Sequence, residues 1–359
     1  MRKFIAQHKI LTTLLLTVFL FLMIAAICLG YLWNKLGLIQ YHDGTTPSQS
    51  QLESEIQDFE DNSPILSESD IVGLEEVTEE PTLPESAPID DSSVLNILLI
   101  GTDEHTKNFS ENARSDSMIL VSINKNTKAI KLVSLERGIG VPVLEGPYTG
   151  QHDWLTHIFR YGGADLLLKT VQTCFSVDID YYVRVNFQSV ISSIDAIGGV
   201  DVELTQAEAD YLNAPEQIPL WQGADHQILS AGLTHMDGIT ALTYARIRAI
   251  DSDWVRVTRQ RKVIIAAFEK LKVSGFIGLD ELATQVFPLV QTNFTKLELL
   301  ELILTAPTYI NSTIDQMTLP QKGTYGTMRG MGGRSLFAVD FEAAAATLHQ
   351  YLYGDSVTS

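Results

Sequence analysis

The feature that most constrains this chain is an uncharged stretch near its N-terminus. Residues Ile10–Trp33 form 24 consecutive positions without Asp, Glu, Lys or Arg. As a helix rising ~1.5 Å per residue, the stretch would be about 36 Å long, more than the ~30 Å hydrocarbon core of a bilayer. A cleaved signal peptide has a shorter apolar region. The stretch therefore predicts an uncleaved transmembrane anchor over residues 10–33.

The residues that flank this anchor predict its orientation. Arg2, Lys3 and Lys9 precede it, whereas only Lys35 follows it closely. Positively charged flanks remain in the cytoplasm. We therefore expect residues 1–9 to be a cytoplasmic tail, with the rest of the chain after the anchor outside the cell membrane.

The next segment is acidic. Between Asp43 and Asp91 there are 15 Asp and Glu residues and no Lys or Arg. Such a composition buries too little apolar surface to offset chain entropy, so residues 34–92 are predicted to be a disordered tether. The tether accounts for most of the net charge of −19. Because the remaining chain has no broad basic face, nucleic-acid binding is excluded as a function.

Residues 93–272 alternate between strand-like and helix-like patterns. The runs "VLNILLIGTD", "YYVRVNF" and "VDVEL" are typical of strands, and "NKNTK" between "SMILVSI" and "AIKLVSL" predicts a hairpin. The runs "GGADLLLKTVQTCF" and "QSVISSIDAIGG" predict helices. This alternation indicates an α/β domain with a mixed central sheet covered by helices on both faces. Residues 273–359 are predicted to be a helical extension packed on the same domain.

Arginine is concentrated in the 17-residue stretch "ARIRAIDSDWVRVTRQR". Five of the 12 arginines of the chain lie there: Arg246, Arg248, Arg256, Arg259 and Arg261. If "TYARIR" is extended, Arg246 and Arg248 share one face. A helix is predicted to follow, from about Asp253 to Leu271.

The inward face of this predicted helix becomes polar toward its start. Helical spacing places on one stripe Leu271, Phe268 or Ala267, Ile264, Gln260, Val257 or Arg256, and Asp253. Polar groups at the mouth of a core are costly without partners, and an anionic ligand would supply partners for guanidinium groups. The alternative is an exposed Asp253–Arg256 pair worth under ~1 kcal/mol. Taken together, Arg246, Arg248, Arg256 and Gln260 favour the ligand.

Other polar residues fit this interpretation less well. Arg259 lies off the stripe, and Arg261 and Lys262 are predicted to be solvated. Cys174 lies within a predicted helix, and His157 has no partner that the sequence reveals. We therefore expect no covalent nucleophile.

A second group of charged residues lies upstream, at the ends of predicted strands. Asp103 ends "IGTD", Arg114 and Asp116 precede the strand in "ARSDSMILVSI", and Arg137 follows the next one in "SLERG". Loops at strand ends carry binding groups. Carboxylates from two loops could hold Mg²⁺ together with substrate phosphates. In the alternative interpretation, Asp103 caps a turn and Asp116 pairs with Arg114.

At this point the motifs identify a resemblance. The chain resembles the LytR-CpsA-Psr family of bacterial envelope proteins. The resemblance rests on "NILLIGTD", "RSDSMILVSIN", "LVSLER", "YGGADLLLKTV", "IDYYVRVNF", "IDAIGGVDVEL", "HMDGITALTYARIR" and "DSDWVRVTRQR", in the order of the family. It covers the anchor and residues 94 to 272.

The resemblance implies a phosphotransferase that moves a glycopolymer, such as a teichoic acid or capsule polymer, from an undecaprenyl-pyrophosphate carrier to a peptidoglycan hydroxyl. Asp103 and Asp116 match the carboxylates that hold Mg²⁺ or Mn²⁺. The pyrophosphate would be bound by Arg114, Arg137, Arg246, Arg248, Arg256, Arg259 and Gln260. The catalytic set would be Arg114, Arg137, Arg246, Arg248 and Asp253.

The chain departs from the family pattern at one position of this site. The family usually has Asp after the arginine that matches Arg137, and here the residue is Gly138. Two other functions stay open beside the phosphotransferase, and Gly138 bears on the second of them. One is a lipid-pyrophosphate hydrolase with water as acceptor, and the other is a non-catalytic envelope regulator that binds polyprenyl phosphate.

Overall fold

The structure is a computed structural model that describes residues 23, 26, 28–42, 66, 68–78, 80–89, 91–104, 109, 113–217, 228–274 and 283–354. Within these residues, no helix is both long enough and apolar enough to cross a bilayer. Most of the predicted anchor, all of residues 1–9 and residues 43–65 of the predicted tether lie outside the described ranges.

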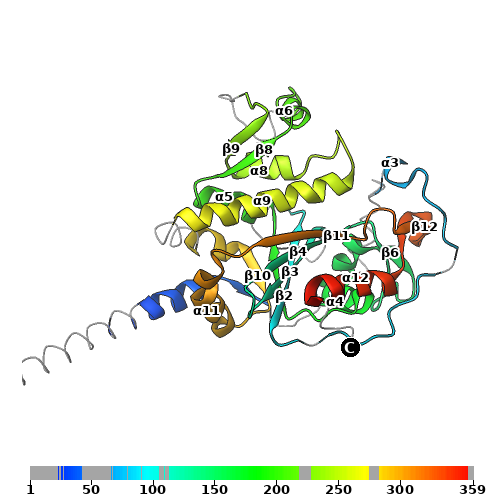
Figure 1. The fold of residues 1–359 in the computed structure, drawn as a ribbon, viewed down its shortest axis with the longest axis horizontal. Coiled ribbons are helices and arrows are strands. Elements are labelled where there is room, and N and C mark those ends of the chain that lie inside the picture. The colour runs from blue at the N-terminus through cyan, green and yellow to red at the C-terminus, as the bar shows by residue number, and fades with distance from the viewer. Residues whose placement is uncertain are drawn as a thin grey trace, which may run out of the picture.

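Among the described residues, seven strands form a central mixed sheet in the order β1-β10-β7-β2-β3-β4-β11 (Figure 1). The strands are β1 (Gln40–Tyr41), β2 (Val94–Thr102), β3 (Ser115–Asn124), β4 (Ile130–Leu135), β7 (Tyr181–Val185), β10 (Val290–Thr292) and β11 (Ile314–Leu319). The β2–β3 and β3–β4 pairs are antiparallel, whereas β2 pairs with β7 and β4 pairs with β11 in parallel. This mixed sheet confirms the predicted fold class at the level of a mixed α/β domain.

The β3–β4 hairpin forms where the sequence predicts it. The Asn124 side chain accepts hydrogen bonds from the backbone N–H groups of Asn126 and Thr127, both at 2.9 Å. Lys128 adopts a left-handed conformation with φ of 63°. A polar side chain that bonds its own turn favours such a reversal between two apolar runs.

Helices cover the sheet on both sides. Helices α4 (Leu155–Phe175) and α12 (Phe341–Tyr353) pack on one face, where they meet side chains such as Leu98, Leu120 and Val133. Helix α9 (Asp253–Ser274) packs on the other face, against Ile119 and Leu132. Adjacent residues of one strand therefore serve opposite cores, as the period of two in a strand requires.

A smaller unit packs on the side of α9 that faces away from the central sheet, at the top of Figure 1. It consists of α5 (Phe187–Ala196), β8 (Val200–Leu204), α6 (Gln206–Leu212), β9 (Gly232–Met236) and α8 (Gly238–Ala245). Strands β8 and β9 form a separate antiparallel hairpin, so the predicted strand "VDVEL" does not join the central sheet. Helix α9 contributes to the core of this unit as well, through Val263.

The region after residue 272 is helical only in part, whereas the sequence predicts a helical extension. It contains α11 (Lys296–Thr305), α12 and the short 3-10 helices η1 (Phe287–Leu289), η2 (Ala306–Tyr309) and η3 (Met331–Gly333). Strands β10 and β11 join the central sheet, and β12 (Tyr325–Arg329) pairs with β13 (Ser335–Val339). These strands depend on distant partners, and strand formation follows such packing more than local propensity.

Part of the predicted tether is also ordered. The described residues among 66–89 include α3 (Glu68–Ile71) and pass beside β12, at the end of the domain where β5 (Gly140–Pro142) pairs with β6 (His152–Trp154). Bridges join Glu76 to Thr327 and Ile89 to Val177. Four of its apolar residues, Leu66, Ile71, Leu74 and Leu83, pack on the main core, whereas Val72 and Val77 are exposed. Because these residues are scattered through an acidic segment, the composition of the segment does not predict their packing.

Candidate active site

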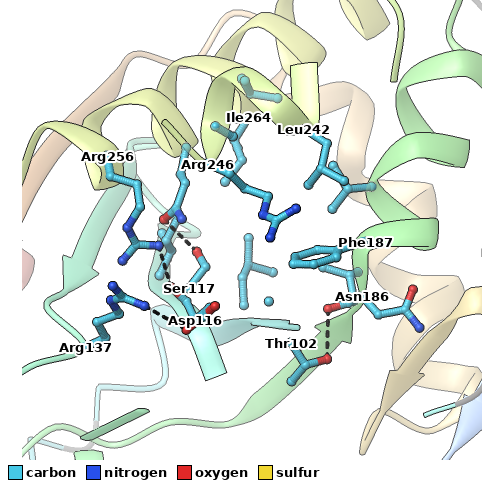
Figure 2. Close-up of a pocket in the computed structure, with 18 of the residues that line it drawn as sticks. Thr102, Asp116, Ser117, Arg137, Asn186, Phe187, Leu242, Arg246, Arg256 and Ile264 are labelled. Carbon is cyan, nitrogen blue, oxygen red and sulfur yellow. Dashed lines mark hydrogen bonds and ion pairs between the residues drawn. The ribbon is translucent and has the colours of Figure 1, made fainter. Parts of the chain in front are cut away.

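A pocket of about 430 Å³ lies between the central sheet and helices α8 and α9 (Figure 2). Its polar lining includes Arg114, Arg137, Arg246, Arg248 and Arg256. Its apolar lining includes Leu99, Ile119, Val190, Leu242, Val263 and Ile264. Figure 2 shows Arg137, Arg256 and Asp116 grouped on one side, with Phe187 and Leu242 on the other. The pocket thus offers cationic donors at one end and apolar surface at the other.

Asp253 binds three of these arginines. Its buried carboxylate accepts hydrogen bonds from Arg256 Nε and Nη2, both at 2.8 Å, and from Arg137 Nε at 3.2 Å. Arg248 Nε lies 3.2 Å from Asp253 Oδ1. Burial opposes ionisation of Asp253, but the charges of Arg256 and Arg137 outweigh it and hold the pKa of this carboxyl far below its usual range. The alternative of an exposed Asp253–Arg256 pair is therefore wrong.

Asp116 faces the pocket from the start of β3. Arg137 Nη1 donates to Asp116 Oδ1 at 3.0 Å, whereas the alternative interpretation pairs Asp116 with Arg114. Arg256 Nη1 donates to the Asp116 backbone oxygen at 2.8 Å. Burial raises the pKa of Asp116, but Arg137, Arg256 and Arg114 together lower it below its usual value. Asp116 is thus ionised at neutral pH, which suits a cation ligand better than a general base.

Asp103 lies beside this group at the end of β2. Its Oδ1 accepts from the Arg114 backbone N–H and its Oδ2 from Arg114 Nε, both at 2.9 Å. The antiparallel pairing of β2 with β3 brings the carboxylates of Asp103 and Asp116 to the same end of these two strands. In the described part of the chain, no three His, Cys, Asp or Glu side chains form a metal-binding group. Two carboxylates fit Mg²⁺ only when phosphate oxygens complete its coordination.

The loop after α8 carries Arg246 and Arg248. The stretch "TYARIR" is not extended, because α8 continues to Ala245. Asp237 starts this helix by accepting the Thr240 backbone N–H at 2.9 Å. The Arg246 guanidinium lies 4.3 Å from the centre of the Phe187 ring. Figure 2 shows Arg246 pointing toward Phe187. Arg246 is an exposed residue, so its charge can turn toward a ligand without breaking a buried pair.

Gln260 lines the pocket one turn after Arg256, as the predicted polar stripe requires. Its side-chain oxygen accepts a hydrogen bond from Ser117 Oγ at 3.0 Å. Because the amide oxygen makes this bond, the amide N–H₂ group of Gln260 does not contact Ser117. Gln260 thereby links α9 to β3 at the boundary between the polar and the apolar lining.

Arg259 lies elsewhere. Its Nε donates to Glu208 Oε1 at 2.7 Å, and its Nη1 donates to the Ile247 backbone oxygen at 2.9 Å and to Asp251 Oδ1 at 3.0 Å. It is 1% exposed and is not among the residues that line the pocket. The structure therefore places Arg259 behind the loop that carries Arg248, as its position off the helix stripe indicates.

Arg261 is buried, so the prediction that it is solvated is wrong. Its Nη1 donates to Ser134 Oγ at 2.6 Å and to Thr318 Oγ1 at 2.8 Å, and its Nε donates to Gln316 Oε1 at 3.1 Å. These partners lie on β4 and β11. Lys262, the next residue, is exposed as predicted.

His157 and Cys174 lie outside the pocket lining. His157 has a partner that the sequence did not reveal, because its Nδ1 lies 2.9 Å from Asp153 Oδ2. Burial lowers the pKa of His157 despite this carboxylate. Cys174 is fully buried in α4, and burial raises the pKa of its thiol. Neither side chain is positioned to act as a nucleophile in the pocket.

The sequence did not reveal several other lining residues, among them Thr102, Ser117, Asn186 and Phe187. Asn186 and Phe187 lie at the end of a predicted strand, but β7 ends at Val185 and Asn186 caps α5. The Asn186 side chain accepts the Ser189 backbone N–H at 3.0 Å. The pattern Asn-x-x-Ser before an apolar helix is a capping signal that could have located this turn.

Gly138, the departure from the family pattern, has a local explanation. A Cβ atom at this position would lie 2.4 Å from Leu66 Cδ2. The Gly138 backbone oxygen accepts from the Phe337 N–H at 2.9 Å. Leu66 from the ordered end of the tether thus occupies the space that a side chain at Gly138 would need.

The fold and the site together define an α/β protein with a cationic mouth on an apolar pocket, an arrangement suited to an amphiphilic phosphate ester. The model of the LytR_cpsA_psr family matches residues 66–351. The chain therefore belongs to the LytR-CpsA-Psr family, as its motifs indicate.

Relatives in this family have named activities. The chain is 30% identical over 215 residues to the polyisoprenyl-teichoic acid–peptidoglycan teichoic acid transferase TagU of Bacillus mycoides strain KBAB4. This match covers 59% of the chain and 64% of TagU.

Solved structures have the same fold. The protein gbs0355 of Streptococcus agalactiae is 27% identical, with a TM-score of 0.60 over 73% of this chain and 88% of that one. TagV of B. subtilis is 26% identical, with a TM-score of 0.56 over 73% of this chain and 98% of TagV.

Proposed function

We propose that this chain is a membrane-anchored phosphotransferase that acts outside the cytoplasm. It would move a glycopolymer from an undecaprenyl-pyrophosphate carrier to a hydroxyl of peptidoglycan. The observation that carries the proposal is the pocket itself, with arginines at one end and apolar side chains at the other. A polyprenyl pyrophosphate has the same division into a charged head and an apolar chain. The activity named for TagU supports the same class of donor and acceptor.

The proposed reaction is attack of a peptidoglycan hydroxyl oxygen on the phosphorus that bears the glycan. A new P–O bond forms to peptidoglycan, and the P–O bond to the lipid phosphate breaks. The lipid leaves as polyprenyl phosphate, which takes the bonding electron pair, and the hydroxyl proton is released. Arg137, Arg248 and Arg256, oriented by Asp253, would stabilise the charge that develops on the phosphoryl oxygens.

Arg246 and Arg114 would bind the pyrophosphate from the other sides of the pocket. Arg246 is exposed and stacks on Phe187 at 4.3 Å, so it is available to an incoming anion. Gln260 would donate its amide N–H₂ group, since its oxygen already accepts from Ser117. For Arg259 we propose an indirect role, because its guanidinium binds Glu208 and Asp251 instead of lining the pocket.

The proposed cofactor is Mg²⁺, or Mn²⁺ in its place. Asp116 and Asp103 would hold the cation, which would neutralise part of the charge on the phosphate oxygens. Both carboxylates already accept hydrogen bonds from arginine in the free protein. Calorimetric titration should therefore show weak Mg²⁺ binding that strengthens when geranyl pyrophosphate is present. Equal affinity under both conditions would count against a shared site.

The transferase is tested by supplying a lipid-pyrophosphate glycan, Mg²⁺ and peptidoglycan oligomers to the full chain in vesicles. We expect a glycan–peptidoglycan conjugate. Free glycan phosphate without conjugate would establish the hydrolase instead. Copurified polyprenyl phosphate with no turnover under any acceptor condition would establish the regulator.

A further inference from the structure

Glu136 is a buried acid next to the pocket that the proposed reaction does not use. It follows β4 directly, and its side chain is 0% exposed. Its backbone N–H donates to the Leu319 oxygen at 2.9 Å, so the pairing of β4 with β11 fixes its position. In the described part of the chain, no donor forms a hydrogen bond to either of its carboxyl oxygens. A buried carboxylate without donors is costly, so this residue needs an explanation.

The groups that act on Glu136 come from several elements. Asp253, Arg256 and Arg261 belong to α9, Arg137 is the next residue in the chain, and Tyr325 belongs to β12. Of these, Asp253 is in hydrogen-bonding contact with the Glu136 carboxyl. The guanidinium groups of Arg256 and Arg137 point to Asp253 and Asp116 instead of Glu136. Glu136 therefore faces another carboxyl group, that of Asp253.

Two carboxyl groups in contact cannot both be ionised without strong repulsion. Asp253 is the one that carries the charge, because three arginines bind it. Burial raises the pKa of Glu136 well above its usual value, and the charge of Asp253 raises it further. A proton on Glu136 removes the repulsion and supplies the missing donor, because the carboxylic acid O–H can donate to the Asp253 carboxylate.

We propose that Glu136 is a positioning residue that remains protonated at neutral pH and donates a hydrogen bond to Asp253. Asp253 in turn orients Arg137, Arg248 and Arg256 toward the pocket. In its neutral form Glu136 also adds no negative charge to a cluster that must attract an anion. The inference rests on the proposed function, since it assigns these arginines to the pyrophosphate.

The protonation state is tested by infrared difference spectroscopy of the full chain at neutral pH. The wild type should show the carbonyl stretching band of a protonated carboxylic acid, and Glu136→Gln should lack it. Glu269→Gln is the matched control, because Glu269 is an exposed glutamate on α9 paired with Lys272. Absence of the band in the wild type, or its persistence in Glu136→Gln, would overturn the proposal.

The positioning role is tested by the affinity for geranyl pyrophosphate. Gln can donate an amide N–H to Asp253, whereas Met has a similar length and no donor. We expect Glu136→Gln to retain most of the affinity and Glu136→Met to bind about tenfold more weakly, the equivalent of one hydrogen bond. Equal affinities of Glu136→Met and the wild type would refute the positioning role. Neither readout requires turnover, so a failure of glycan transfer would refute the proposed function alone.

Discussion

Arg246 and Arg256 line the same pocket but have different partners. Arg256 is 4% exposed and donates two hydrogen bonds to the buried carboxylate of Asp253. Arg246 is exposed and stacks on Phe187. A guanidinium bound to a buried carboxylate supports the fold whether or not a ligand is present. An exposed guanidinium contributes mainly when an anion arrives.

Arg246→Ala should therefore weaken ligand binding without affecting the fold. Loss of one charge-assisted contact of ~1.5–3 kcal/mol corresponds to a rise of about 10- to 150-fold in the dissociation constant for geranyl pyrophosphate. The melting temperature should stay unchanged. Arg329→Ala is the control, because Arg329 is 64% exposed and lies outside the pocket lining. Unchanged affinity in Arg246→Ala would remove this residue from the binding site.

Arg256→Ala should weaken binding and also destabilise the protein. Removal of this arginine deprives the buried Asp253 of two hydrogen bonds, and breaking a buried ion pair costs ~3–5 kcal/mol. Thermal unfolding should begin several degrees lower than in the wild type. A melting temperature equal to that of Arg246→Ala would contradict the role assigned to the Asp253–Arg256 pair.

The sequence predicts the residues of one helix face better than it predicts buried arginines. Asp253, Arg256 and Gln260 follow from helical spacing, because a single periodicity places all three. The partners of Arg259 and Arg261 come from other elements, such as Glu208 and Ser134. No local pattern indicates such partners. The sequence therefore predicts that Arg261 is solvated, whereas in the structure it is buried.

At the scale of elements, α9 connects the parts of the molecule. Its first turns carry Arg256 and Gln260 to the pocket and Asp253 to the arginines that line it, and later residues contribute to two cores. Arg261 attaches the helix to the edge of the central sheet through hydrogen bonds to Ser134 and Thr318. The orientation of the whole helix, and thus of its pocket residues, depends on this attachment.

Arg261→Met should destabilise the protein, because it leaves the buried Ser134 hydroxyl without this donor, at a cost of ~1–3 kcal/mol. The neighbouring Lys262→Met is a matched control that removes an exposed charge of the same sign. Urea unfolding should give a lower free energy for Arg261→Met only. Similar values for the two variants would show that the hydrogen bonds to β4 and β11 contribute little.

Elements were predictable where their signals are local. Strands β2, β3 and β4 follow from long apolar runs, and the β3–β4 turn follows from its Asn-rich sequence. The strand β11 is defined by parallel pairing with β4, which lies far away in the chain. The glycine at position 138 also depends on a distant residue, because Leu66 occupies the space that a side chain there would need.

At the scale of the whole molecule, the ionised carboxylates of Asp116 and Asp253 bind arginines from distant segments of the chain and so stabilise the fold. The pKa values of Asp116 and Asp253 are below the usual 3.8, because arginines outweigh their burial. Such groups contribute stability that is present above the unfolded-state pKa and is lost as pH falls below it. Glu136 affects stability in the opposite direction. Because its pKa is raised in the folded protein, the free energy of unfolding decreases as the pH rises above 4.5.

We therefore expect the free energy of unfolding to fall steeply as the pH is lowered below the usual carboxyl value of 3.8. Asp253→Asn should be less stable than the wild type at neutral pH, and this gap should narrow in acid. Asp210→Asn, a change at an exposed residue, should follow the wild type at every pH. Urea titrations across this range provide the test, and a constant gap would contradict the assignment of Asp253.

In the proposed reaction, the bond that breaks joins two phosphates of the carrier. Mass spectrometry of the lipid product from the transfer reaction shows directly which bond has broken. We expect polyprenyl monophosphate, in equal amount to the glycan–peptidoglycan conjugate and with one phosphate retained in that conjugate. Release of polyprenyl pyrophosphate, with no phosphate in the conjugate, would show that the sugar alone is transferred and would contradict the proposed reaction.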